Sequence, residues 1–519
     1  GQLEASLELE AGNLTLAAKL AAELAPANGL ERMRVGTLTA RIAAAAGNYA
    51  AAAAALMLLL PSDSDDPQRL SDTIWSYAQR TPAFQIQDLI EHADNRPSRA
   101  WWQLSLATNG SLTVRAQHDA WTSWRARNAY HLASQYPPGS LLAESPAPAR
   151  NALMVPLTGT LASAGQAVRD GFIAAYFQSR PTLEQDLIVY DSASAPMNAL
   201  YEQALLQEAD IIVGPLSKAN VEALAAIEPV IPVVALNSLP PKPAPGLVVD
   251  PLANPIDETP PLVERPPAAP RIVQFPLAVE DEASAIAERI TRDGHRRILF
   301  FRGNQGWAAR GAQQFDSDLG TQTEVVGFGV FNDPKEVTAV VGDVLLVAES
   351  NARNVELRRI LGKQIEFIPR RRHDAEAVVA LVDRVQMATL KPALRFHFAR
   401  DLPIYTASQA VRDGGELSSL NGVRVCDIPW RLHPSDLEMR VKNAFRDATG
   451  PLGSLYALGI DAFRVINHLA HLTQSPAASI VGSTGRLRLD ADGRIRRSLD
   501  WALVRNGRFT PLPAVVPGP

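Results

Sequence analysis

The segment VPLTGTLASAGQAVRDGFIAAY, residues 155–176, decides the fold of most of this chain. An apolar run leads into a loop of small and hydroxyl-bearing residues, and an amphipathic helix follows. The pattern returns in DLIVYDS at 186–192 and in ADIIVGPLSKANVEAL at 209–224. Short apolar strands that alternate with helices predict parallel sheets with helices on both faces. Nearly continuous apolar strands are what such two-sided burial requires.

The same alternation continues outward from this segment. Helices are expected at 163–179, 197–208, 217–227, 281–293, 306–319 and 454–472. Strands are expected at 152–155, 186–190, 211–213, 232–236, 271–275, 298–302, 325–330, 344–347, 377–381, 403–406 and 423–428. About 370 residues is too long for one doubly wound sheet, so we expect two lobes.

The chain is therefore expected to contain a helical domain at 1–137, a linker at 138–149 and a bilobal domain at 150–519. The linker follows from the prolines that break the helical pattern after Tyr136. Strand signals are almost absent before it and regular after it.

Within the bilobal domain, the chain is expected to cross between the lobes more than once. Lobe one would combine about 150–275 with 429–480, and lobe two about 276–428 with 481–519. The stretch 240–270 contains 11 prolines, which excludes helix and sheet and predicts an exposed loop.

The helical domain carries an internal repeat. AGNLTLAAKLAAEL (11–24) aligns with AGNYAAAAAALMLL (46–59) at an offset of 35 residues, close to the period of tetratricopeptide helix pairs. This predicts a short tetratricopeptide-like α-solenoid; an ordinary helical bundle with a chance match is the alternative. Five tryptophans of this domain are expected in its core, with a partner-binding groove as the alternative: Trp75, Trp101, Trp102, Trp121 and Trp124.

Composition limits the classes of function. The 50 basic and 55 acidic residues give a net charge of −5, which provides no overall field for nucleic acid. A single cysteine, Cys426, excludes an intramolecular disulfide framework. It lies in the apolar run VRVCDI, which favours a buried structural thiol over a nucleophile.

Catalytic signatures are missing from the sequence. It has no GxxxxGK[ST] loop, no HExxH and no GxSxG. Asp461, His468 and His471 lie on one face of an expected helix and are conceivable metal ligands, although an ordinary helix surface is commoner. Residues 490–493, between RLRL and RIRR, predict a hairpin turn and not a calcium loop, because Trp501 stands at the twelfth position. We expect no enzyme, no cofactor and no metal.

One dense positive charge run, Arg370-Arg371-Arg372-His373, falls between a strand-like segment and a helix. Arg370, Arg371 and Arg372 are candidate contacts for an acidic partner surface, with a solvated loop as the alternative.

The quoted strand–loop–helix segments resemble the type I periplasmic-binding-protein fold. In receptors of that fold, hydroxyls and amides of such a loop bind a ligand carboxylate, which helix N-termini favour. The resemblance implies an interlobe cleft, and ligands bind beyond the carboxyl ends of strands. Candidate cleft residues are Thr158, Ser163, Ala164, Asn237 and Ser238, with Asn304 and Glu349 from lobe two.

Three further segments resemble the LpoA family of outer-membrane lipoprotein activators of a class A penicillin-binding protein. They are PRRRHDAEAVVALVD (369–383), KPALRFHFARDLPIYTAS (391–408) and GSTGRLRLDADGRIRRSLDWALVRNGRFTPL (482–512). That family joins a tetratricopeptide-like domain to a binding-protein-like domain, in the order found here.

The resemblance implies a non-enzymatic regulator of peptidoglycan synthesis. It would bind a class A penicillin-binding protein and activate its transpeptidase activity from the periplasm, with peptidoglycan as a further expected contact. An N-terminal lipid outside these residues would anchor it to the inner leaflet of the outer membrane. The alternative is a periplasmic solute receptor for a small amino-acid-like ligand. The helical domain favours the regulator, because repeat arrays form partner-binding surfaces.

Overall fold

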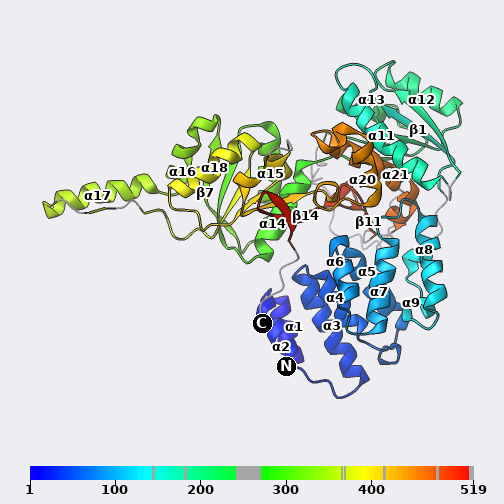
Figure 1. The fold of residues 1–519 in the computed structure, drawn as a ribbon, viewed down its shortest axis with the longest axis horizontal. Helices are drawn as coiled ribbons and strands as arrows, with labels where there is room; N and C mark the ends of the chain where they lie inside the picture. Colours follow the sequence, from blue (N-terminus) through cyan, green and yellow to red (C-terminus); the bar gives the residue numbers. More distant parts are fainter. Residues whose placement is uncertain are drawn as a thin grey trace, which may run out of the picture.

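Two α/β lobes and a stack of helices make up the protein in the computed structural model (Figure 1). The structure describes residues 1–142, 147–180, 184–240, 270–363, 366–367, 370–412, 416–474 and 478–512. Residues 143–146 of the expected linker and 241–269 of the proline-rich stretch lie outside these ranges.

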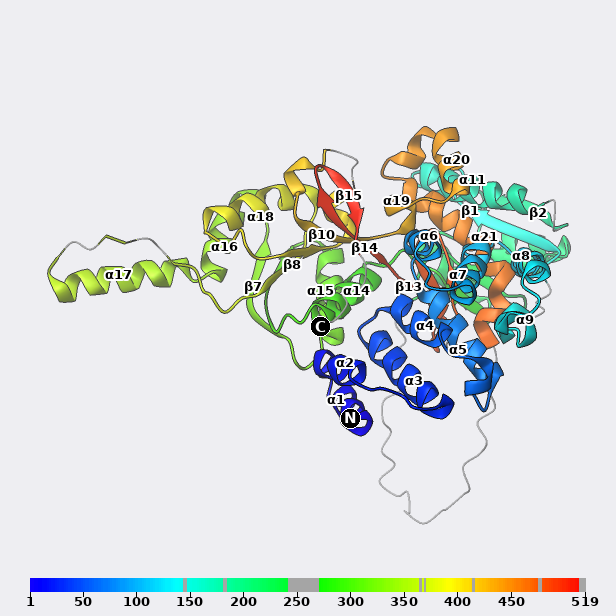
Figure 2. The ribbon, with the colours of Figure 1, turned by 60° about the horizontal axis from the view of Figure 1, so that its bottom comes forward.

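The N-terminal domain is a series of helices in which neighbours in sequence pack together (Figure 2). Both copies of the AGN motif turn a corner between helices, with Gly12 at φ 79° and Gly47 at φ 72°, which glycine adopts readily. The repeat predicted from the sequence is thus confirmed as two helix pairs. The helices are α1 Gln2–Glu10, α2 Leu14–Ala22, α3 Gly29–Ala45, α4 Tyr49–Met57, α5 Pro67–Arg80, α6 Ala83–Glu91, α7 Arg96–Thr108, α8 Val114–Arg127, α9 Leu132–Gln135 and α10 Gly139–Leu142.

The five tryptophans of this domain all lie in its core, each at most 4% exposed. The Trp124 indole donates to the carbonyl of Ala100 at 2.9 Å, and that of Trp75 to the hydroxyl of Ser140. The indoles therefore hold the helices together, and the alternative of a tryptophan-lined groove is wrong.

Lobe one contains a five-stranded parallel sheet in the order β2-β1-β3-β4-β5. Because its strands alternate, Leu153 and Val155 pack under α11 and α21, whereas Ala152 and Met154 pack under α12 and α13. The strands are β1 Arg150–Val155, β2 Asp186–Asp191, β3 Ile211–Val213, β4 Val233–Ala235 and β5 Ile272–Gln274. The helices are α11 Ala162–Ser179, α12 Met197–Leu206, α13 Lys218–Ala226 and α21 Gly453–Gln474, with α19 Pro429–Leu432 and α20 Asp436–Ala444 beside them.

Lobe two contains a seven-stranded sheet in the order β15-β14-β10-β9-β8-β6-β7. Its first five strands in sequence run parallel, and β14 and β15 extend one edge in antiparallel fashion. The strands are β6 Arg297–Gly303, β7 Glu324–Phe331, β8 Ala377–Leu381, β9 Ile404–Thr406, β10 Val423–Asp427, β14 Asp500–Arg505 and β15 Arg508–Pro511. The helices are α14 Val279–Arg292, α15 Gly306–Asp318, α16 Val337–Val344, α17 Val347–Leu361 and α18 Arg384–Phe396.

The expected hairpin around 490–493 forms, but in a small third sheet: β11 Ile480–Val481, β12 Arg486–Leu489 and β13 Ile495–Ser498. Leu487, Leu489 and Ile495 join the apolar core of lobe one. The expectation that all of 481–519 belongs with lobe two is therefore corrected, since β14 and β15 alone join that sheet.

The strand expected at 344–347 is wrong. This apolar stretch ends α16, turns at Leu346, which has φ 57°, and begins α17. Val337, Val341 and Val344 are buried at helical spacing. One face of a helix therefore buries the apolar residues that a strand would also have buried. Helix α17 projects away from lobe two in both views (Figures 1 and 2).

Candidate functional site

In the loop after β1, two of the donors that could bind an interlobe ligand are already used within the protein. The Thr158 hydroxyl donates to Oδ2 of Asp191 at 2.6 Å, and the Leu157 amide donates to Oδ1 at 2.8 Å. The Thr158 hydrogen bond is the main reason that the pKa of Asp191 lies below its usual value. An ionised internal carboxylate thus occupies the donors that a ligand carboxylate would need, and it would repel a second anion.

The other candidate cleft residues are also partly engaged or far apart. Asn237 donates to the carbonyl of Leu216 at 2.9 Å and accepts from the amide of Ser238. Ser163 and Asn304 are exposed, and Ala164 is half-buried at the start of α11. Glu349 lies on the projecting helix α17, 4.0 Å from Arg353, and not at a strand end as expected. Its assignment to the cleft is therefore corrected.

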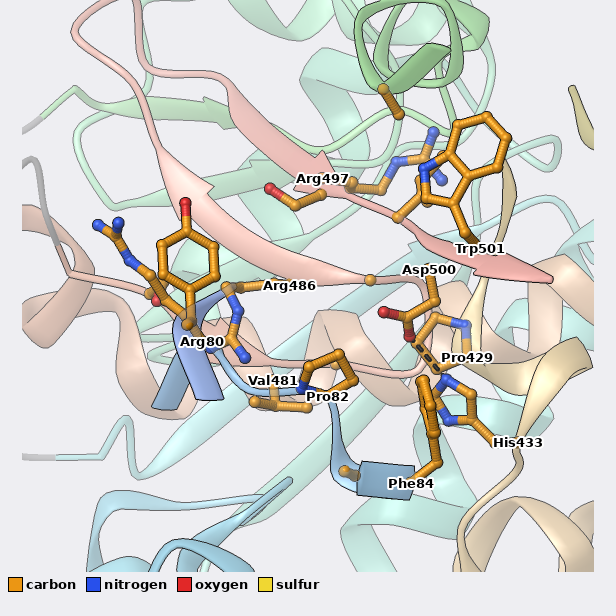
Figure 3. Close-up of a pocket in the computed structure, with 18 of the residues that line it drawn as sticks. Arg80, Pro82, Phe84, Pro429, His433, Val481, Arg486, Arg497, Asp500 and Trp501 are labelled. Carbon is orange, nitrogen blue, oxygen red and sulfur yellow. Dashed lines mark hydrogen bonds and ion pairs between the residues drawn. The ribbon is translucent and has the colours of Figure 1, made fainter. Parts of the chain in front are cut away.

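The structure instead contains a cavity of about 920 Å³ at the joint between the helical domain and the bilobal domain. Its lining comes from α4, α5 and α6 of the helical domain, from α14, and from the β12–β13 hairpin and the segments beside it (Figure 3). None of the seven candidate cleft residues lines it. We call it the joint cavity.

A buried carboxylate organises one wall of the joint cavity. Asp461 of α21 is fully buried and accepts hydrogen bonds from the amides of Ser483 and Thr484, at 2.8 and 2.7 Å. It also pairs with Arg464, whose Nη2 donates to the carbonyl of Gly110 in the helical domain at 3.2 Å. One carboxylate thereby fixes the loop that leads into β12 and connects it to the helical domain.

A histidine and a phenylalanine form a second connection across the joint. His433 Nε2 lies 2.7 Å from Asp500 Oδ2, and the Phe84 ring of α6 lies 5.1 Å from the His433 ring (Figure 3). Burial lowers the pKa of His433, but the hydrogen bond and charge of Asp500 outweigh it, so the net pKa is raised. Protonation of this histidine therefore favours the folded bilobal domain, to which both His433 and Asp500 belong.

The three arginines of the positive charge run differ in how far their side chains are buried. Arg371 donates to Asp401 at 2.7 Å and to the carbonyl of Phe398, and its side chain is 8% exposed. Arg372 forms two 2.7 Å hydrogen bonds with Asp374, which hold the pKa of that carboxyl at about 2. Arg370 is exposed. Two of the three candidate contacts thus support lobe two, and Arg370 remains on the surface.

The conceivable metal ligands do not come together. Asp461 already accepts hydrogen bonds from the loop that leads into β12. Nδ1 of His468 lies 2.9 Å from the carbonyl of Arg464. Burial is the chief reason that the pKa of His468 falls to about 4. Burial also raises the pKa of the Cys426 thiol, which keeps it protonated. In the described part of the chain, no three acidic, histidine or cysteine side chains are placed to hold a metal ion.

Sequence reasoning missed the joint cavity because its walls come from distant segments. One signal was present: the alternation in RLRL and RIRR puts arginines on one face of the hairpin. Among the described residues, no helix combines the length and apolarity needed to cross a bilayer.

Two lobes with helix-covered sheets, preceded by a helical stack, define a binding-protein-like body fused to a repeat-like domain. A "putative branched-chain amino acid ABC transporter" from Rhodospirillum rubrum shares the bilobal fold, with a TM-score of 0.50 at 16% identity over 70% of this chain and 99% of that chain. Full-length LpoA from Haemophilus influenzae matches both domains, with a TM-score of 0.54 at 20% identity over 98% of this chain and 87% of that chain. These likenesses confirm the expected fold class.

The sequence itself matches the family described as "LppC putative lipoprotein" over residues 7–258 and 262–507. The chain belongs to that family. A curated relative, "Penicillin-binding protein activator LpoA" from Vibrio cholerae serotype O1, is 24% identical over 458 residues, covering 85% of this chain and 72% of the relative. The resemblance drawn from residues 369–408 and 482–512 is thereby confirmed.

Proposed function

We propose that this protein activates a class A penicillin-binding protein by direct contact and has no catalytic activity of its own. The observation that carries the proposal is the match to the activator family over nearly the whole chain, across both domains. Two groups that were candidates for chemistry are engaged: Cys426 is a buried thiol, and Asp461 accepts hydrogen bonds from a loop.

Activation by contact requires the activator to bind the active conformer of the synthase more tightly than the inactive one. A tenfold activation of a minor state needs a preference of about 1.4 kcal/mol. A modest docking surface is sufficient for this, so no ligand chemistry in the activator is needed.

In the cell, we place the protein in the periplasm, at the inner leaflet of the outer membrane, through an N-terminal lipid. Membership of a lipoprotein family supports the lipid. We further propose that it contacts peptidoglycan near the synthase, and that the transpeptidase step is the one stimulated.

The test is a crosslinking assay with the cognate synthase and its lipid-linked substrate, with and without this protein. We expect more crosslinked product with it and no product from this protein alone. Unchanged crosslinking, under conditions where the two proteins demonstrably bind, would defeat the activator assignment.

The receptor alternative is tested separately by calorimetry with free amino acids. Because Asp191 already occupies the Thr158 donor, we expect no heat of binding. Binding that Thr158→Ala abolishes would instead restore the receptor hypothesis.

A further inference from the structure

The β12–β13 hairpin presents arginines on one face. In its antiparallel register Arg486 lies opposite Ser498, and Arg488 lies opposite Arg496, so all four side chains share a face. The other face carries Leu487, Leu489 and Ile495, which are buried in lobe one, together with Arg497. The polar face therefore points away from lobe one, and its residues line the joint cavity.

Ion pairs use only some of the charged side chains that line the joint cavity, which include the carboxylates of Asp318, Asp436, Glu438 and Asp500. Among its arginines, five have a carboxylate partner: Arg289 with Asp293, Arg292 with Glu288, Arg464 with Asp461, Arg496 with Asp490 and Arg497 with Asp281. Within the described residues, Arg80, Arg486 and Arg488 form no ion pair. Arg80 lies over the Tyr49 ring at 5.1 Å, and Arg488 is exposed.

Of these three arginines, Arg486 has the least favourable surroundings for a charged side chain. Its side chain is half-buried, yet its Nη1 atom is buried and lacks a hydrogen-bond partner in the described structure. Burial lowers its pKa to about 10, and the positive charge of Arg80 acts in the same direction. The negative charge of Asp500 acts in the opposite direction, but this carboxylate is bonded to His433 and forms no ion pair with Arg486 in the described structure. A buried guanidinium donor without an acceptor is unfavourable unless a ligand supplies one.

We propose that the joint cavity binds a multiply charged oxyanion, a polycarboxylate or a phosphate, through the guanidinium groups of Arg80, Arg486 and Arg488. Guanidinium forks bind carboxylate and phosphate oxygens in pairs. The cavity volume of about 920 Å³ suits a ligand of organic size. Arg80 from the helical domain and Arg486 from the hairpin both line this cavity (Figure 3), and their charges interact, so one anion would contact both domains.

The proposal goes beyond activation of the synthase and does not depend on it. The test is calorimetry of the full chain with sodium pyrophosphate and with sodium citrate, at constant ionic strength set with sodium chloride. We expect saturable binding of at least one probe. Pyrophosphate binding alone identifies phosphate as the preferred chemistry, and citrate binding alone identifies carboxylate; both results support the site.

Single substitutions identify which arginines bind the anion. Arg486→Gln, Arg80→Gln and Arg488→Gln should each weaken it about tenfold or more, as expected for loss of a charge-assisted hydrogen bond. Arg99→Gln, at an exposed arginine of α7 outside the cavity, is the matched control and should bind as the parent does.

Thermal unfolding without ligand separates binding from a structural role. Arg486→Gln should not lower the melting temperature, because it removes an unpaired cation. If Arg486→Gln does not fold, the anion binding of Arg80→Gln and Arg488→Gln still tests the proposal. No binding of either probe, or equal binding by the parent and all the cavity variants, would overturn the proposal.

Discussion

At the scale of single residues, His433 makes the stability of the bilobal domain sensitive to pH. Its pKa in the folded protein is raised, so its contribution to stability is fully present below the unfolded pKa of about 6.5. The contribution is lost as pH rises through the folded pKa. Asp500 and Glu438 are the acidic groups that favour the charged ring, and the Phe84 ring packs against it at a tilted angle.

We therefore predict that His433→Gln lowers the melting temperature most at acidic pH. The difference from the parent should shrink steadily between pH 5.5 and 8.5, as measured by calorimetry. A difference that grows with pH would contradict the assignment of His433 as the charged partner of Asp500.

A second prediction at this scale separates the three arginines of the run. Arg372→Gln should destabilise lobe two by about 1–3 kcal/mol, since it removes two hydrogen bonds to Asp374, which keeps its ion pair with Arg297, and the donor to the carbonyl of Val326. This loss should diminish as pH falls toward the Asp374 pKa of about 2. The ionised carboxylate stabilises the folded protein through Arg372, and protonation at low pH removes that contribution. Denaturant titrations at several pH values measure both effects.

Arg370→Glu serves as the contrasting change. Stability should shift by at most about 0.5 kcal/mol, because the residue is exposed. Association with the synthase should slow mainly at low salt, where screening is least. An association rate that is equally unaffected at every salt concentration would remove Arg370 from the docking surface.

At the scale of elements, α11 and α21 cross in a close backbone contact within lobe one. A Cβ atom at Gly459 would lie 2.0 Å from the carbonyl oxygen of Val168, and one at Gly171 would lie 2.1 Å from that of Tyr456. These two glycines let the helices approach backbone to backbone. The second segment of lobe one, which includes α21, is held to the first segment through this contact.

Gly459→Ala should therefore destabilise the protein by about 1–3 kcal/mol, since backbone and not a flexible side chain must move. Gly306→Ala, at the start of α15, is the control: no heavy atom lies within 4 Å of its added Cβ, so stability should stay nearly unchanged. Equal effects of the two changes, measured by chemical denaturation, would contradict this account of the crossing.

At the scale of the whole molecule, side chains from both parts connect the helical domain to the lobes. The described connections include Arg464 with Gly110, Phe84 with His433, and Gly47 beneath the Arg292 side chain. We propose that the bilobal domain carries most of the activation and that the helical domain mainly extends its reach.

The double variant Phe84→Ala, Arg464→Lys should test this division of labour. We expect small-angle scattering to show a looser association of the two domains, because the Phe84–His433 ring contact is lost and the hydrogen bond to Gly110 is weakened. Activation of the synthase in solution should stay within about twofold of the parent, a change of no more than about 0.4 kcal/mol in the barrier. A larger loss of activation would show that the joint itself takes part in activation.

The sequence alone determined the elements and the kind of protein, because both depend on local patterns. Alternation of apolar strands and helices after residue 150, and the AGN corners at 11–13 and 46–48, are signals carried by neighbours in the chain. The family segments are likewise continuous. An apolar run such as 344–347 was ambiguous, since a strand and a helix face can bury the same residues.

Only the tertiary structure decided which polar groups are free. Thr158 is a good ligand donor by its position, but Asp191, 33 residues away, takes its hydroxyl. Arg371 and Arg372 look like a surface patch until Asp401 and Asp374 are brought against them. Nothing in the segment RLRL distinguishes Arg486 from Arg488. Folding places Arg486 at the joint cavity, where its buried Nη1 atom has no acceptor in the described structure. Hydrogen bonds and ion pairs act over a few ångströms in space, and no spacing along the chain specifies those distances.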